Sequence, residues 1–240
     1  MGRDYIIGIV GGMGSYATVG FFKRIVDAFP AEKEWERPRI IIDNYCTLPS
    51  RVRAVLYHER VDELVACMAE SAGNLYKIGA DRIIFACNTA HVFLPMVIEK
   101  IPEIKEKVMN LIEMSAIECE RRNYRRIKLL ATEGTYLSYI YPDIFKEHHI
   151  SVNHSEDETD IRALIEDVKQ NKINKRSKDK FLELIQKEIG GGKNDGLVLG
   201  CTELPVLYSC LADTGFYGNV VDPLQCVINE LKKEFTSISE

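Results

Sequence analysis

Runs of apolar, largely β-branched residues alternate along the chain with stretches in which apolar residues recur every three or four positions. The first pattern predicts strands, and the second predicts amphipathic helices. Strands are expected at residues 6–10, 40–45, 83–87, 108–112, 127–131, 150–154, 197–201 and 219–221. Helices are expected at residues 15–28, 58–78, 95–100, 135–148, 159–170, 178–189 and 223–235. Continuous apolar strands are typically buried on both faces, so we expect an α/β fold with mainly parallel sheets covered by helices.

Two pairs of similar segments indicate that the chain contains an internal repeat. Residues 9–18 (IVGGMGSYAT) align with residues 129–138 (LLATEGTYLS). Residues 85–89 (FACNT) align with residues 199–202 (LGCT) at a similar offset. In the second pair, an apolar strand ends in Cys and a Thr follows closely. Because the two matches occur in the same order, we interpret them as the trace of one duplication.

The repeat predicts a domain organisation. We expect a first α/β domain at residues 1–113 and a second at residues 114–221, with the helix at about 222–240 packing back onto the first. Ligands of open α/β sheets bind at the carboxyl ends of the strands. The repeat therefore predicts a cleft between the two halves, with Cys87 and Cys201 on opposite walls.

Cys87 and Cys201 are each expected at the end of a strand, before a helix. Unpaired backbone N–H groups and the helix dipole at such a position favour a thiolate, and can lower the pKa of a cysteine from about 8.5 by one unit or more. A thiolate on one side of a carbon and a thiol on the other can remove a proton from one face and return one to the opposite face. The pair therefore predicts inversion of a stereocentre without a cofactor.

Four segments also resemble the motifs of a known family: GGMGSYAT at residues 11–18, ACNTAH at 86–91, LATEGT at 130–135 and LGCTELP at 199–205. In this order, and over most of the chain, they are similar to the aspartate/glutamate racemases, which are cofactor-independent amino-acid racemases. The resemblance implies two flavodoxin-like domains related by a pseudo-twofold axis, with the active site in the cleft between them. It also implies that Cys87 and Cys201 act as acid and base, and that the protein forms a homodimer.

The resemblance further implies how an acidic substrate is held. The LPSR segment at residues 48–51 resembles the family's Ile-Pro-Asp-Arg segment, and Lys169 resembles its substrate-contacting lysine. Arg51 and Lys169 together are suited to binding a distal carboxylate, whereas without the resemblance both would be interpreted as surface charges. Ser50 stands where the aspartate-racemase pattern has Asp, so the motif leaves the identity and handedness of the substrate open.

Further polar groups are expected to bind the α-carboxylate and stabilise the enediolate charge that develops at it. The backbone N–H groups concerned lie near Met13, Asn88, Thr89, Thr132, Thr135 and Thr202. The glycines around Met13 are interpreted as allowing close approach to a small anion. Glu203 has three possible roles: it contacts the substrate ammonium, it raises the pKa of Cys201, or it caps a helix.

Composition and charge exclude several other classes of protein. The net charge of -5 over 240 residues gives no field that would attract nucleic acid or an anionic membrane. No apolar run reaches the roughly 18 residues of a membrane helix. The seven cysteines form no CxxC pair, which favours reduced thiols in a cytoplasmic protein. His91 follows Cys87 by four residues but lacks further ligands at a suitable spacing, so no metal site is expected.

These observations lead to one main hypothesis and two alternatives. The main hypothesis is a cofactor-independent racemase of aspartate, glutamate or a close relative, with a small amino acid as its ligand. The first alternative is a lyase or cis/trans isomerase of small dicarboxylates that uses one cysteine as a nucleophile. The second is a protein that binds a small molecule in the same cleft without catalysis.

Overall fold

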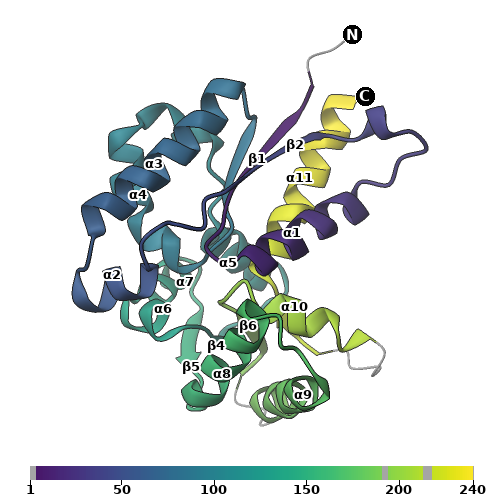
Figure 1. The fold of residues 1–240 in the computed structure, drawn as a ribbon. Helices are drawn as coiled ribbons and strands as arrows, with labels where there is room; N and C mark the ends of the chain where they lie inside the picture. Colours follow the sequence, from purple (N-terminus) through teal and green to yellow (C-terminus); the bar gives the residue numbers. More distant parts are fainter. Residues whose placement is uncertain (1–3, 191–193, 213–217, 240) are drawn as a thin grey trace.

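The computed structural model of the chain describes residues 4–190, 194–212 and 218–239. It contains two parallel β-sheets with helices packed on their faces (Figure 1). The strand order is β2-β1-β3 in the first sheet and β5-β4-β6-β7 in the second. Each strand pair in these sheets is parallel. The predicted fold class is therefore confirmed.

The strands are β1 (Ile6–Gly11), β2 (Arg39–Asn44), β3 (Arg82–Phe85), β4 (Arg126–Leu130), β5 (Ser151–His154), β6 (Gly196–Leu199) and β7 (Val220–Val221). The α-helices are α1 (Ser15–Ala28), α2 (Arg51–Tyr57), α3 (Val61–Ile78), α4 (Leu94–Lys100), α5 (Leu111–Arg121), α6 (Glu133–Leu137), α7 (Ile140–Glu147), α8 (Glu158–Lys169), α9 (Lys175–Gly190), α10 (Leu204–Ser209) and α11 (Pro223–Ser239). Short 3-10 helices are η1 (Glu34–Glu36), η2 (Thr89–Phe93) and η3 (Pro102–Lys107).

The first sheet is buried on both faces because its central strand, β1, is apolar along its length. Successive side chains of a strand point to opposite faces. Ile6 and Val10 accordingly join the apolar core with α3 and α4, whereas Ile7 and Ile9 join the core with α1 and α11. Figure 1 shows these two helical layers on either side of the sheet.

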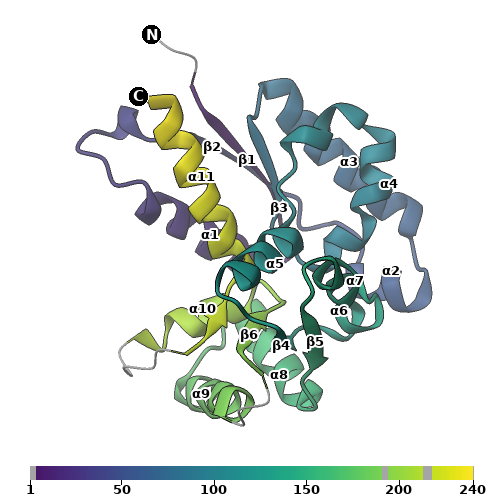
Figure 2. The same cartoon turned by 180° about the vertical axis from the view of Figure 1, so that it is seen from behind.

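The second sheet repeats this arrangement (Figure 2). Leu130 and Leu199 pack against α8, α9 and α10, and Leu129 and Val198 pack against α5 and α7. β4 lies between β5 and β6 as β1 lies between β2 and β3. The two pairs of aligned segments therefore occupy corresponding places in the two sheets. Residues 9–18 and 129–138 begin in β1 and β4 and continue beyond them, and residues 85–89 and 199–202 begin at the last residues of β3 and β6.

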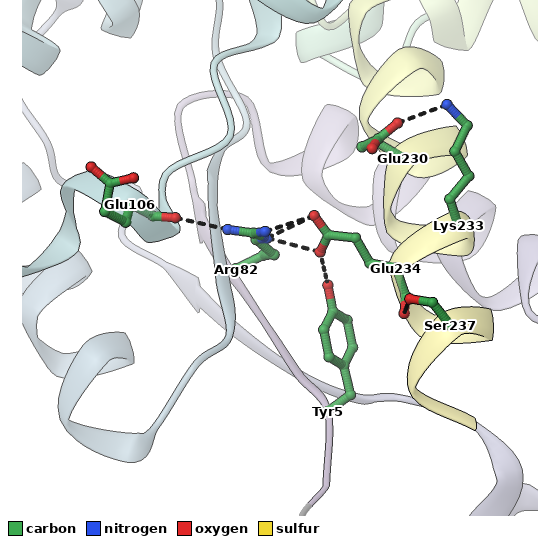
Figure 3. A network of polar contacts seen from close by, with 7 residues as sticks. All are labelled: Tyr5, Arg82, Glu106, Glu230, Lys233, Glu234 and Ser237. Carbon is green, nitrogen blue, oxygen red and sulfur yellow. Dashed lines mark hydrogen bonds and ion pairs between the residues drawn. The ribbon is translucent and has the colours of Figure 1, made fainter. Parts of the chain in front are cut away.

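The C-terminal helix α11 packs against α5 and α1, beside the first sheet (Figure 2). Near its end, Glu234 accepts hydrogen bonds from the Arg82 guanidinium of β3, at 2.8 and 3.0 Å, and from the Tyr5 hydroxyl at 2.6 Å (Figure 3). Arg82 also donates to the Glu106 carbonyl at 2.7 Å. The chain thus passes from the first sheet to the second through α5 and returns through β7 and α11. The domain limits stay a prediction, and residue 113 lies inside α5.

The strand predicted at residues 108–112 is wrong. Only Val108 forms a bridge, to Ile83, and α5 begins three residues later at Leu111. Asn110 caps α5 because its side-chain oxygen accepts hydrogen bonds from the backbone N–H groups of Ile112 and Glu113. A short apolar run does not distinguish a buried strand from the first turn of a buried helix.

Two of the predicted helices begin or divide at left-handed residues. His58 and Arg60 have φ angles of 54° and 50°, so the helix predicted at 58–78 begins only at Val61. Tyr139, with φ 56°, divides the helix predicted at 135–148 into α6 and α7. α2, α5 and α10 are not among the predicted helices. In the described ranges, no helix is both long and apolar enough to cross a membrane.

Candidate active site

A pocket with a cavity volume of about 60 Å³ lies where loops from both sheets meet. Its walls come from the segments that follow β1, β3, β4 and β6, together with the start of α2 and the end of α8. The lining residues are Met13, Ser50, Arg51, Val52, Cys87, Asn88, Thr89, Thr132, Lys169, Gly200, Cys201, Thr202 and Glu203. Ten of the eleven residues predicted for the site are in this set, and Thr135 is the exception.

Both cysteines lie in loops, two residues beyond the ends of β3 and β6, and not at the last strand position as predicted. Cys87 is half-buried and Cys201 is 7% exposed. The helix after Cys87 is the 3-10 helix η2, and a turn separates Cys201 from the short helix α10. A long helix dipole therefore acts on neither sulfur atom.

Glu203 controls the state of Cys201. The Cys201 thiol donates a hydrogen bond to Glu203 Oε2 at 2.9 Å. Burial and the negative charge of Glu203 raise the pKa of Cys201 well above its usual value, and the positive charge of Lys169 only partly opposes them. Cys201 is therefore held as a neutral thiol that can give up a proton.

The second carboxylate oxygen of Glu203 faces the loop after β1. Glu203 Oε1 is buried and has no hydrogen-bond partner among the described residues. A Cβ atom at Gly14 would collide with this oxygen, so the absence of a side chain at Gly14 makes room for Glu203 and not for a ligand. Glu203 occupies the N-cap position of α10, but its side chain makes no capping hydrogen bond. The helix-capping role considered from the sequence is therefore not the one that the structure shows.

The Asn88 amide is fixed in one orientation by a tyrosine from the other half of the chain. The Tyr141 hydroxyl of α7 donates to Asn88 Oδ1 at 2.8 Å, and both side chains are buried. Asn88 Nδ2 is left without a partner among the described residues. Nothing in the sequence distinguishes Tyr141 from other apolar positions of an amphipathic helix, so its contact with the site was not predictable.

His91 holds the loop that carries Cys87. Its Nδ1 lies 2.9 Å from the Cys87 carbonyl oxygen, and its Nε2 accepts a hydrogen bond from the Leu111 backbone N–H at 3.1 Å. These partners require a neutral ring with its proton on Nδ1, and burial lowers the pKa of His91 to about 4. Within the described ranges, no three His, Cys, Asp or Glu side chains are grouped as a metal site requires.

Three threonine hydroxyls join the two halves behind the pocket. Thr89 Oγ1 lies 2.8 Å from Thr135 Oγ1 and 3.2 Å from Thr132 Oγ1. Thr132 also caps α6, because its hydroxyl accepts a hydrogen bond from the Thr135 backbone N–H at 3.4 Å. Thr135 is fully buried behind the wall. It positions Thr89 and Thr132 and does not itself face the cavity.

The two predicted cations both line the pocket. Arg51 donates to the backbone carbonyls of Met13 at 2.7 Å and Pro49 at 3.0 Å, and its Nε is buried without a partner among the described residues. The Lys169 ammonium lies 3.0 Å from Glu166. Burial opposes the charged form of Lys169, but Glu203 and Glu166 outweigh this effect and raise its pKa.

Unpaired polar atoms are concentrated in this pocket. The described residues contain four buried side-chain nitrogen or oxygen atoms without a hydrogen-bond partner. Three of these atoms are Arg51 Nε, Asn88 Nδ2 and Glu203 Oε1, which belong to pocket-lining residues. Leaving such atoms unpaired is costly, so they mark where a ligand supplies the missing partner. Two donors and one anionic acceptor match the carboxylate and ammonium groups of an amino acid.

Two parallel sheets with one pocket where their loops meet define an α/β protein whose candidate ligand site is shared by two similar halves. The chain belongs to the Asp/Glu/hydantoin racemase family, whose family model matches residues 10–231. Among solved structures, Picrophilus torridus aspartate racemase has a TM-score of 0.81 and 27% sequence identity, and the match covers 97% of this chain and 94% of that one.

More distant structures share the fold. A glutamate racemase from Francisella tularensis has a TM-score of 0.66 and 17% identity, and the match covers 98% of this chain and 82% of that one.

Among curated relatives, the broad-specificity amino-acid racemase RacX of Bacillus subtilis is 28% identical over 171 residues, which are 69% of this chain and 71% of that protein. A glutamate racemase from Aquifex aeolicus is 26% identical over 180 residues, which are 74% of this chain and 68% of that protein.

Proposed function

We propose that this protein racemises an acidic amino acid, aspartate or glutamate, by proton transfer between Cys87 and Cys201 without a cofactor. The observation that carries the proposal is the single pocket that contains both cysteines and the unpaired groups of Arg51, Asn88 and Glu203. Names of the relatives include aspartate, glutamate and broad-specificity racemases. A homodimer and a cytoplasmic location belong to the same proposal, the latter because the cysteines are free thiols.

The reaction requires one thiolate and one thiol on opposite faces of the substrate. Cys201 is the thiol, since burial and Glu203 keep it protonated. Cys87 acts as the thiolate that removes the Cα proton, and Cys201 then delivers a proton to the other face. For the opposite enantiomer the two residues exchange these roles. The Asn88 amide binds the α-carboxylate throughout the reaction, and nearby backbone N–H groups stabilise the charge that develops on it as it becomes an enediolate.

The same polar atoms orient the substrate. Glu203 Oε1 receives the ammonium group, which brings Cα close to the Cys201 sulfur. Arg51 Nε and the Lys169 ammonium bind the distal carboxylate, and Lys169 exchanges Glu166 for this new partner. Ser50 contributes no charge. Its hydroxyl caps α2 by accepting a hydrogen bond from the Arg53 backbone N–H.

Exchange with deuterated water tests this function directly. Each enantiomer of aspartate and glutamate is incubated with the protein in D₂O, and the products are followed by NMR and chiral chromatography. We expect the opposite enantiomer to appear with deuterium at Cα, because the returned proton comes from a thiol that exchanges with solvent. A new product would support a lyase or cis/trans isomerase instead. Unchanged substrate would support a binding protein.

Replacing Tyr141 by Phe is expected to raise KM about tenfold and to change kcat by less than about threefold. Without the Tyr141 hydroxyl, the Asn88 amide is free to rotate. The Asn88 Nδ2 donor, which binds the substrate and the transition state equally, is then no longer held in place. The unfolding free energy should fall by about 1–3 kcal/mol, because Asn88 Oδ1 is left unpaired. Steady-state kinetics and urea denaturation measure both effects.

The matched control is Tyr136→Phe. The Tyr136 hydroxyl is also buried, but it accepts from the Ala131 backbone N–H at 2.8 Å and donates to the Leu129 carbonyl at 3.2 Å. This variant should lose comparable stability without a change in KM. Equal KM values for Tyr141→Phe and the unmodified protein would contradict the positioning role of Tyr141.

A further inference from the structure

A second cavity, of about 330 Å³, adjoins the pocket that contains the cysteines. Ser50, Val52, Thr132 and Lys169 line both spaces, so the two cavities meet along this edge. The second space, called the outer cavity below, is more than large enough for an amino-acid side chain. A substrate held between Cys87 and Cys201 therefore has room to extend past Ser50 and Lys169.

The wall of the outer cavity carries aliphatic side chains beside its charged groups. Val52 and Leu56 come from α2, Ile165 comes from α8, and Ala131 follows β4. Leu56 is half-buried and belongs to none of the apolar core clusters of the described residues. Its side chain is thus available to contact a ligand, and burying an aliphatic group against this wall is favourable.

Four of the five charged groups around the outer cavity form two ion pairs. Arg162 pairs with Glu133 at 2.9 Å, and Lys169 pairs with Glu166 at 3.0 Å. Glu158 lies in the first turn of α8, where the helix dipole favours a negative charge. In the described part of the chain, no unpaired cation faces this cavity. Apart from Lys169 at the shared edge, which the proposed function assigns to the acidic substrates, the outer cavity offers no cation for a distal carboxylate and has room for an uncharged side chain.

We propose that the outer cavity is a subsite for uncharged aliphatic side chains, so that the enzyme also racemises neutral amino acids such as norleucine and methionine. This inference rests on the proposed function, because the Cα of these substrates must still lie between Cys87 and Cys201. The chemistry is the same removal and return of a proton at Cα and needs no further reactant. Ser50 permits this path, because it is short and uncharged.

A homologous series of substrates tests the subsite. Alanine, 2-aminobutyrate, norvaline and norleucine differ only in the number of methylene groups, and deuterium exchange at Cα gives kcat/KM for each. If the side chain enters the outer cavity, kcat/KM should rise about fourfold per added methylene, or about 60-fold over the series. Aspartate and glutamate are measured in parallel. Exchange of the acidic amino acids together with a flat or falling series would overturn the subsite alone.

Variants at Leu56 locate the effect. Leu56→Trp fills the outer cavity and should lower kcat/KM for norleucine at least tenfold while changing that for aspartate less than twofold. Leu137→Trp is the matched control, because Leu137 is 55% exposed on the neighbouring helix α6 and does not line the cavity. Leu56→Asn keeps the branched shape of the side chain but makes the wall polar, and it should also lower kcat/KM selectively for norleucine. Deuterium exchange of aspartate by each Leu56 variant shows that the variant is folded.

The remaining outcomes separate this inference from the proposed function. Equal losses for norleucine and aspartate in both Leu56 variants would overturn the subsite. Exchange along the neutral series without exchange of either acidic amino acid would support the subsite and overturn the acidic substrate. Absence of exchange with every amino acid would overturn the proposed function, and the subsite with it.

Discussion

Cys87→Ser and Cys201→Ser are each expected to lower the rate of racemisation by about 10³-fold. A serine hydroxyl is a far weaker acid than a thiol, so it does not form the anion that removes the Cα proton at neutral pH. Loss of one thiol also removes the proton donor for one direction of the reaction. The measurement is the rate of inversion of each enantiomer in D₂O, with deuterium at Cα followed separately from inversion.

Cys46→Ser is the matched control for both variants. Cys46 is an exposed free cysteine that does not line the pocket, and this variant should keep full activity. Deuterium exchange that persists in a single active-site variant should be confined to the enantiomer whose Cα–H faces the remaining thiol. Full inversion by either active-site variant would remove that cysteine from the mechanism.

Glu203→Gln is expected to lower kcat about 10²-fold and to move the high-pH limb of the rate profile to lower pH. The negative charge of Glu203 disfavours the Cys201 thiolate and, after burial, is the main cause of the raised pKa of Cys201. Glutamine keeps the size of the side chain but not its charge, so the pKa of Cys201 falls. The direction that uses Cys201 as an acid is lost when this thiol ionises, and in the variant the loss begins at a lower pH.

The pH profile of kcat in both directions measures this shift. Glu166→Gln serves as the comparison, because Glu166 is a nearby carboxylate that pairs with Lys169 and makes no hydrogen bond to Cys201. The high-pH limb of the Glu166→Gln profile should lie at the same pH as in the unmodified protein. An unshifted limb in Glu203→Gln would show that burial alone sets the pKa of Cys201.

Periodicity identified most of the fold because the central strands are buried on both faces. β1 and β6 are apolar throughout, and such runs stand out from amphipathic helices. Short elements gave weaker signals. Ser50 caps α2 and Pro205 lies in the first turn of α10, but neither helix is long enough to show a clear apolar period. The N-cap serine of α2 and the first-turn proline of α10 are the local features that would have identified these two helices.

The candidate site was predictable where its residues follow strand ends. Cys87 and Cys201, together with their neighbouring threonines, lie in loops at the carboxyl ends of β3 and β6, as parallel sheets require. Contacts between the two halves were not predictable, because they depend on how the sheets are placed relative to one another. The approach of Glu203 to Gly14 is of this kind.

The return of α11 to the first sheet affects how the protein emerges from the ribosome. Ile7 and Ile9 are synthesised before the second sheet, yet part of the apolar surface that covers them, including Leu224 and Val227, is made after it. The residues of the second sheet are complete before α11 is made. The nascent first half therefore exposes part of an apolar face until α11 is made, and exposed apolar surface of this kind is prone to aggregation.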